Sequence, residues 1–539
     1  MKKSFIKIVL LAGIISIMPA CHDLDVPITS ALTPDAFPKT QAQFVQAAGP
    51  AYAALRGNFA LDYHFLQSQS TDESIMPARG GNWYDNQGYL MPHYHSWTPD
   101  HGMTNSAWSW FSNIVGTTNQ ALAILGENMP DNNTTKPQML AELRMVRAIA
   151  YFMWMDLFGN VPIITTYGDF TPKANAPRAE VFAFIEKEIK DALPSLSTTV
   201  DVSTYGRPTA FAAQALLAKM YLNAEYYTGT AKYNECITAC DAVISSGKFA
   251  IEPRASYLQM FYPNNGPAMK EFIFAIPYDP AMASLPGTNG FQYHARYDVL
   301  RSQTKRYSLP FTPSAPRSTL PEFYAHFTRD SNDIRNKQWL VGKQYNADGS
   351  PLMVTTTKKG YDQFYTGSDG GAALTYHVEI TPDITLRQSP TLFDCGNDEI
   401  AWNMGIRNVK FYPDASSTSR NQNNDIPFLR YSDIILMKAE AILRGGAATG
   451  GATALSLVNQ LRAQRSTSPA WTAVTLEDVY SERCRELAWE SWHRNDMIRY
   501  GKFEGKWGFK TNTDTYRRIL PIPTNAFVLN PALKQNPGY

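Results

Sequence analysis

The chain has 539 residues, of which 44% are hydrophobic and 18% charged, and its 49 lysines and arginines nearly balance 48 aspartates and glutamates. This balance gives no basis for nucleic-acid binding, which requires a basic face. The five cysteines show no CxxC or Cys/His spacing for zinc. A chain of this length can bury a sizeable core without a disulfide framework.

The first twenty residues have the composition of a secretory signal. Lysines flank an apolar run over residues 8–17, which is too short to remain as a membrane-spanning helix. Ala20 stands directly before Cys21, and this junction resembles the lipobox of bacterial lipoproteins. We therefore expect a signal peptide over residues 1–20 and lipidation of Cys21; the alternative is a non-lipidated signal followed by a chance cysteine.

Cleavage would change the charge only slightly and leave an acidic start. It removes three lysines and no acid, which leaves 46 basic against 48 acidic residues and a formal charge of −2. Asp23 and Asp25 then follow the cysteine, an arrangement that accompanies export to the outer face of the outer membrane in lipoproteins of this kind. No later apolar run is long enough to cross a bilayer.

Residues 77–100 are rich in aromatic rings but have neither a helical nor a strand period. Trp83, Tyr84, Tyr89 and Trp97 stand here among Gly, Pro, Asn and Asp, which favour turns. The sequence therefore predicts that large flat rings lie in loops.

Helices are predicted on both sides of a loop-rich middle. Apolar residues recur with a period of 3.6 in nine segments: residues 40–56, 105–125, 137–158, 178–193, 208–226, 233–245, 427–443, 452–465 and 476–500. Pairs of about 34 residues suggest tetratricopeptide-like hairpins, although the consensus pattern is not clean.

The middle of the chain, residues 248–426, has a different character. Strand-like runs at 271–277 and 374–380 alternate with Gly-, Pro-, Asn- and Ser-rich loops. So long a stretch of loops is expected to be functional. We predict one domain over residues 21–539, with a helical N-terminal part to about 247, this insertion, and a helical C-terminal part from about 427.

Several blocks resemble the SusD/RagB family. The most specific is LAELRMVRAIAYFMWMDLFGNVP at 140–162, which looks like the family's signature helix. Further similar blocks are RPTA at 207–210, ALLAKMYL at 215–222, LRYSDIILMKAE at 429–440, ERCRELAWE at 482–490, HRNDMIR at 493–499, LPIP at 520–523 and NPALKQNPGY at 530–539. They follow the family order over nearly the whole mature chain. Ser491 departs from the pattern, because the family usually has a glycine there.

The resemblance implies a fold and a role. The fold would be mainly α, a tetratricopeptide-like scaffold of about four helix pairs, with the loop-rich, partly β insertion forming the ligand face. SusD-like proteins are lipid-anchored at the outer membrane, bind oligosaccharides or polysaccharides without catalysis, and deliver them to a SusC-like TonB-dependent β-barrel transporter.

The aromatic loop suits a sugar ligand. Flat rings cover the apolar faces of sugars, and neighbouring polar side chains can hydrogen-bond the hydroxyls. Gly80 and Gly81 would permit a tight turn that projects a ring outward. The predicted ligand-binding residues are Trp83, Tyr84, Tyr89, Trp97, Arg79, Asn82 and Asp85. The alternative is that these rings pin the loops onto the scaffold.

Aromatic residues of the insertion are candidates for an opposite wall of the site. These are Tyr293, which we include among the ligand-binding residues, and also Phe291, Tyr297 and Trp339. Other aromatics crowd the same region, and nothing in the sequence singles these four out.

Other chemistries find little support. His93, His95 and His101 invite a metal interpretation, but no family metal motif matches, so we expect neither metal nor cofactor. Glu482, Glu486 and Glu490 are spaced one helical turn apart, which favours ion pairs between helices over acid–base catalysis. We predict a non-enzymatic protein. The alternatives are a RagB-like lid that captures peptides, an adaptor that grips protein, or a surface glycoside hydrolase.

Overall fold

The computed structural model of the protein describes residues 37–80, 82–279, 293–356, 374–387, 392–396, 398–417 and 421–539. The predicted signal peptide and Cys21 lie outside the described residues, as do Phe291 and the side chain of Tyr293. Within these ranges, no helix is both long enough and apolar enough to cross a membrane.

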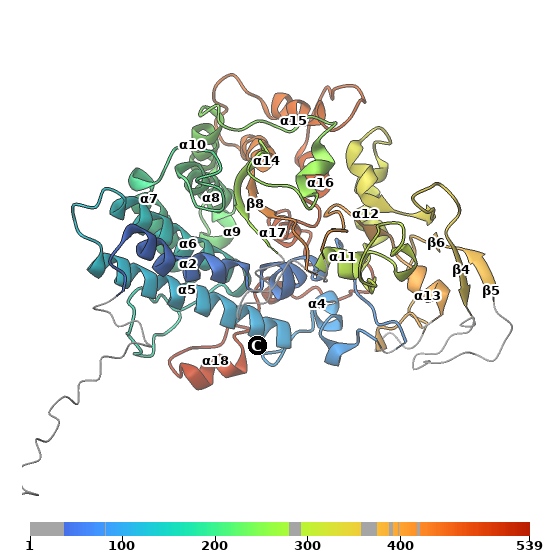
Figure 1. Cartoon of the computed structure of the whole chain (residues 1–539), viewed down its shortest axis with the longest axis horizontal. Coiled ribbons are helices and arrows are strands. Elements are labelled where there is room, and N and C mark those ends of the chain that lie inside the picture. The colour runs from blue at the N-terminus through green and yellow to red at the C-terminus, as the bar shows by residue number, and fades with distance from the viewer. Residues whose placement is uncertain are drawn as a thin grey trace, which may run out of the picture.

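The N-terminal helices form a layered stack at the left of Figure 1. Helix α2 (Gln41–Arg56) packs on α5 (Gly102–Asn128), α5 on α6 (Lys136–Phe158), and α6 on α7 (Arg178–Ala192). A capping box between Thr40 and Gln43 fixes the start of α2. Helix α6, which carries the signature block, is buried on all sides from residue 145 onward and forms the centre of the stack.

The second stack joins segments that are far apart in the sequence. Helix α8 (Ala210–Leu222) packs on α10 (Tyr233–Ile244), and α10 packs on α14 (Tyr431–Leu443), which also contacts α15 (Ala454–Arg462) and α16 (Leu476–Leu487). Strand β1 (Phe272–Ile276) pairs antiparallel with β8 (Ile426–Arg430). This pairing brings the two ends of the insertion together beside α8.

The part of the insertion that follows β1 lies toward the right of Figure 1 and consists of short elements. Its described strands pair as β2 with β7, β3 with β6, and β4 with β5. Their bounds are β2 Trp339–Leu340, β3 Gly342–Lys343, β4 Met353–Thr356, β5 Leu374–His377, β6 Glu379–Ile380 and β7 Arg407–Asn408. A small separate core that includes Val299, Leu340 and Ile380 lies beneath them.

Shorter helices connect these layers. They are α3 (His64–Gln69), α4 (Leu90–Tyr94), α9 (Ala224–Thr228), α11 (Tyr293–Asp298), α12 (Pro321–Thr328), α13 (Glu399–Asn403), α17 (His493–Arg499) and α18 (Thr524–Leu529). Helix α18 packs on α5 below the first stack.

The predicted helices are confirmed in their main parts, with two instructive differences. Residues 427–430, predicted as helix, belong to β8, because their backbone groups pair with β1. The predicted helix over 476–500 breaks into α16 and α17, because Trp489 (φ 63°) and Ser491 (φ 66°) adopt left-handed backbone conformations. Glycine adopts such a φ without strain, which accounts for the glycine that is usual at the position of Ser491 in the family that the sequence resembles. Here the Ser491 hydroxyl lies 2.8 Å from Nδ1 of His64.

Candidate functional site

The aromatic loop is fastened to the insertion through a buried segment. Residues 70–80 are buried throughout, and the backbone of Ile75 pairs with that of Ser318. The amide of Ala78 donates to the carbonyl of Phe393 at 2.8 Å. These contacts hold the base of the loop while its tip remains at the surface.

Arg79 belongs to this anchor, which corrects the prediction that it contacts ligand. Its side chain is 0% exposed and its guanidinium donates to the carbonyl oxygens of Ala401 and, at 3.2 Å, Met404. A guanidinium enclosed in this way cannot reach a sugar hydroxyl at the surface. Its role is to tie the loop to α13 (Glu399–Asn403).

The tip of the loop has an unusual backbone. Trp83, Asp85, Asn86 and Gln87 have φ values of 69°, 41°, 52° and 67°, in the left-handed region that non-glycine residues rarely adopt. Each such residue costs on the order of 1 kcal/mol or more, and strained positions of this kind cluster at binding and catalytic sites. The tip is therefore an independent indication of a functional loop.

The side chains at this tip form a mixed aromatic and polar surface. The half-buried ring of Trp83 packs edge-to-face on Tyr297, with centroids 5.1 Å apart, and the guanidinium of Arg296 lies 5.7 Å from the Trp83 centroid. Tyr84 is half-buried, whereas Asn82 and Asp85 are exposed. Although Asp85 is exposed, the surrounding protein partly desolvates its carboxyl and so raises its pKa, and the charge of Arg296 opposes this.

This contact brings the insertion to the loop, as the sequence suggested. Tyr297 was among the insertion aromatics considered, but it is buried beneath Trp83 instead of facing it across a groove. Trp339 is buried in the core against Trp489. Arg296 was not anticipated, and the only sequence signal for it is that it adjoins Tyr297.

Two of the predicted rings are corrected by their burial. Trp97 is 1% exposed, and its indole N–H donates to the hydroxyl of Tyr539 at 2.6 Å. Tyr89 is buried edge-to-face against Phe65, with centroids 5.7 Å apart. Both rings fix loops to the scaffold and neither offers a face to a ligand.

The three histidines also have structural roles. Nε2 of His95 lies 2.8 Å from the carbonyl of Ser70, and His101 contacts Thr104 and Gly88. Burial lowers the pKa of His93 to about 3, so its ring is neutral. Among the described residues, no three His, Cys, Asp or Glu side chains are grouped so as to hold a metal ion.

The glutamates of α16 and the residues after it are ion-paired, as their spacing indicated. Arg335 contacts Glu482 at 2.6 Å and Glu486 at 3.0 Å, and Arg430 contacts Glu490 at 2.7 Å. Arg430 and Arg465 also contact Glu271. These buried carboxylates join α16 to β1, β8 and the insertion, and they are closed to a substrate.

One arrangement with catalytic residue types was not foreseen. The thiol of Cys484 lies 3.8 Å from Nδ1 of His493, whose Nε2 lies 2.6 Å from the carboxylate of Asp72. The two rings His326 and His493 outweigh burial and hold the pKa of the Cys484 thiol below its usual value. All three members of the Cys–His–Asp set are buried, so no substrate can reach the sulfur.

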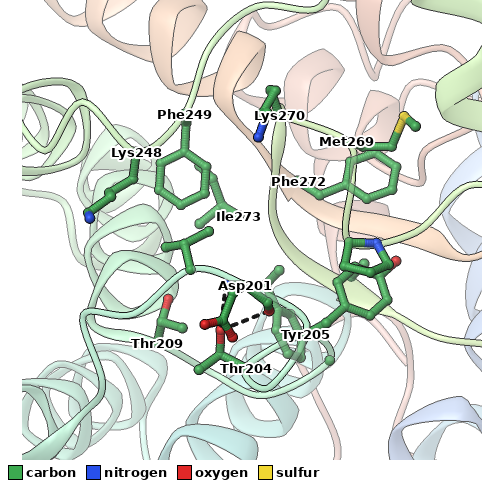
Figure 2. A pocket seen from close by; sticks show the side chains of 15 residues that line it. Asp201, Thr204, Tyr205, Thr209, Lys248, Phe249, Met269, Lys270, Phe272 and Ile273 are labelled. Carbon is green, nitrogen blue, oxygen red and sulfur yellow. Dashed lines mark hydrogen bonds between the residues drawn. The ribbon is translucent and has the colours of Figure 1, made fainter.

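Figure 2 shows a cleft elsewhere, where the loop carrying Asp201, Thr204 and Tyr205 faces Phe249 and β1. Its volume is only about 70 Å³, well below the roughly 300 Å³ at which small-molecule pockets begin. None of the predicted site residues lines it.

Comparison with known proteins identifies the family. A family model described as "SusD family" matches residues 214–539, and a second, described as "Starch-binding associating with outer membrane", matches residues 41–222. The chain belongs to the SusD family. The resemblance carried by the sequence blocks is thereby confirmed.

Relatives and solved structures agree with this assignment. The chain is 25% identical over 440 residues to the starch-binding protein SusD of Bacteroides thetaiotaomicron, covering 77% of this chain and 74% of that one. It is 23% identical to the SusD-like protein P2 of Formosa agariphila, covering 96% and 97%.

Two solved structures show the same fold. One is a laminarin binding SusD-like protein (TM-score 0.71, 22% identity, 93% of this chain and 100% of that one). The other is surface glycan-binding protein A from Bacteroides thetaiotaomicron in complex with laminarihexaose (TM-score 0.70, 17% identity, 92% and 100%). The prediction of a mainly α, SusD-like fold is confirmed.

Proposed function

We propose that this SusD-family chain is a lipid-anchored protein of the outer membrane surface that binds an oligosaccharide or polysaccharide without acting on it chemically. It delivers the glycan to a SusC-like TonB-dependent transporter. The names of its relatives support glycan binding, since one is called starch-binding and others laminarin- and glycan-binding. The burial of the paired glutamates and of the Cys484 set supports a binding role over a catalytic one.

The observation that carries the proposal is the strained tip that holds Trp83 at the surface. The proposed site comprises Trp83 and Tyr84 as stacking rings, with Asn82, Asp85 and Arg296 as hydrogen-bonding partners. The Arg296 guanidinium lies over the Trp83 ring and Tyr297 packs edge-to-face with it, so the ring keeps its orientation before the ligand arrives. Such preorganisation lowers the entropy lost when a flexible sugar binds. Tyr293, at the start of α11, remains a proposed contributor.

The test is affinity electrophoresis of the chain lacking residues 1–21 in gels that contain starch, laminarin or another polysaccharide. Trp83→Ala should weaken retardation roughly ten- to hundredfold, because burying a large apolar side chain contributes about 1.5–3 kcal/mol. Phe170→Ala is the matched control, since Phe170 is 92% exposed on a different loop. It removes an aromatic ring without touching the proposed site.

The outcomes separate function from site. If retardation is lost in Trp83→Ala and retained in Phe170→Ala, the result supports both the glycan-binding function and the proposed site. Retardation that persists in Trp83→Ala keeps glycan binding and refutes the site. A folded chain that no polysaccharide retards refutes glycan binding and favours the peptide-capturing alternative.

Anchoring is tested separately in the full-length chain. The wild-type chain should fractionate with the outer membrane and co-purify with a TonB-dependent transporter. Cys21→Ser should appear in the soluble fraction, because stable anchoring requires the acyl chains. Membrane retention of Cys21→Ser would contradict the lipid anchor.

A further inference from the structure

The segment of the insertion that supports Trp83 carries four cations. Arg296 lies on α11, and Arg301, Lys305 and Arg306 follow it within ten residues. Arg301 and Lys305 are exposed, and Arg296 and Arg306 are half-buried. None of the four side chains is enclosed, so a ligand at the surface can approach them.

These cations have few partners of their own. Within the described ranges, none of the four forms an ion pair, and neither Arg296 nor Arg301 donates a hydrogen bond from its side chain. The guanidinium of Arg296 lies 5.7 Å from the ring centroid of Trp83, and that of Arg301 lies 4.9 Å from the ring centroid of Trp402. An aromatic ring orients a guanidinium without using its N–H groups. The terminal amino groups of both arginines are therefore left for a ligand.

The two arginines belong to one surface, because both lie against segments that the aromatic loop joins. Trp402 adjoins Ala401, whose carbonyl accepts from Arg79 at the base of that loop. Five residues separate Arg296 from Arg301, and five extended residues span at most about 18 Å. One oligosaccharide can therefore reach both guanidiniums.

The carboxylates of this region do not offset its cations. Asp298 is buried and paired with Arg317 at 2.7 Å, whereas Asp85 at the tip of the loop makes no ion pair in the described structure. Residues 79–88, 296–317, 342–344 and 379–407 together hold nine cations and seven carboxylates. The cations are Arg79, Arg296, Arg301, Lys305, Arg306, Arg317, Lys343, Arg387 and Arg407, and the carboxylates are Asp85, Asp298, Glu379, Asp383, Asp394, Asp398 and Glu399. The chain without its predicted signal peptide has two more acids than bases, so positive charge is concentrated here.

We propose that the glycan bound at the Trp83 site is acidic, and that Arg296 and Arg301 hold its carboxylate or sulfate groups. This inference rests on the proposed function and adds the chemical class of the glycan. Guanidinium forks match such groups and form charge-assisted hydrogen bonds with them. A neutral glycan offers only hydroxyls, which leave the charge of the arginines uncompensated. Lys305 adds to the field that attracts an anionic polymer, and Asp85 can still accept from sugar hydroxyls.

The test is isothermal titration of the chain lacking residues 1–21 with polygalacturonate, with iota-carrageenan and, as a neutral reference, with laminarin. Polygalacturonate carries carboxylates and carrageenan carries sulfates, and at least one of them should bind saturably and more tightly than laminarin. Arg301→Gln should weaken that binding roughly tenfold, because it removes a charge-assisted donor. Raised salt should weaken it as well, since the side chain is exposed.

Arg329→Gln is the matched control, because it makes the same substitution at an exposed arginine just after α12. It should leave the affinity within about twofold, and thermal unfolding would check that both variants fold. Trp83→Ala should also lose the acidic polymer, because the arginines and the ring belong to one site. Binding of carrageenan alone assigns the anionic group as sulfate, and binding of polygalacturonate alone assigns it as carboxylate.

Three results would overturn the inference. They are tighter binding of laminarin than of either acidic polymer, equal weakening by Arg301→Gln and Arg329→Gln, and acidic binding that survives Trp83→Ala. The first of these keeps the proposed function and rejects only the acidic class. If a folded chain binds none of the three polymers, and no gel polysaccharide retards it, glycan binding itself fails.

Discussion

Glu73 offers a direct test of how the base of the aromatic loop is held. Its side chain is 0% exposed in the buried segment that leads to Trp83. One carboxylate oxygen accepts from the amide of Trp489 at 2.8 Å, and the other makes no hydrogen bond in the described structure. Burial raises the pKa of Glu73 from 4.5 to about 7, against the opposing charges of His493, Lys410 and Arg317.

The sign of the effect on stability follows from proton binding. Between pH 4.5 and 7 the folded chain keeps a proton on Glu73 that the unfolded chain has released, so the free energy of unfolding falls as the pH rises. A rise in pKa from 4.5 to about 7 corresponds to about 3 kcal/mol, at 1.36 kcal/mol per unit. Glu73→Gln cannot ionise and keeps an oxygen to accept from Trp489. Its unfolding free energy relative to wild type should therefore increase by about 3 kcal/mol between pH 4.5 and 8.

Urea unfolding followed by tryptophan fluorescence at several pH values would measure this difference. Titration of all other groups is common to both chains and cancels. Glu379→Gln, which makes the same chemical change at an exposed position on β6, shows what the substitution does at the surface. A difference between Glu73→Gln and wild type that stays flat over this pH range, or that falls, would refute the reasoning.

Two further substitutions test the buried polar contacts, and a third, at a partly exposed ion pair, serves as a comparison. Arg430→Met removes a buried cation that contacts Glu271, Glu486 and Glu490, and it should lower the free energy of unfolding by about 3–5 kcal/mol. In thermal unfolding Arg144→Met, which breaks a partly exposed pair, should cost only about 1 kcal/mol, and equal losses would contradict the argument. Tyr539→Phe keeps the ring but removes a hydroxyl that accepts from Trp97 and donates to the carbonyl of Ile519, so chemical denaturation should show a loss of about 1–3 kcal/mol. No measurable loss would mean that the C-terminal residue does not hold Trp97.

The sequence predicted correctly those helices and strands whose conformation is set by residues close together in the chain. Helix α6 was predicted because its residues are apolar and its block is family-specific, and the structure buries it as expected. Strand β1 was likewise predicted from its own residues. Residues 427–430 were misassigned because their apolar run suits either a helix or a strand, and only pairing with β1, about 150 positions earlier, decides for the strand.

The candidate site divides in the same way. The sequence shows flat rings and polar side chains within a turn-rich segment. In the structure Trp83, Tyr84, Asn82 and Asp85 lie at or near the surface. Arg79 and Trp97 have the same residue types in the same stretch, yet the structure buries them. Their burial depends on Met404 and Tyr539, which lie more than 300 positions away.

The sequence by itself therefore determined the family, the positions of the long helices and the loop in which a binding surface should be sought, because periodicity, turn chemistry and motif are properties of neighbouring residues. The tertiary structure alone decided which rings of that loop face outward, that Arg296 stands beside Trp83, and that Arg301 lies against Trp402. Burial and charge balance depend on which distant segments fold against one another, and no local pattern encodes that.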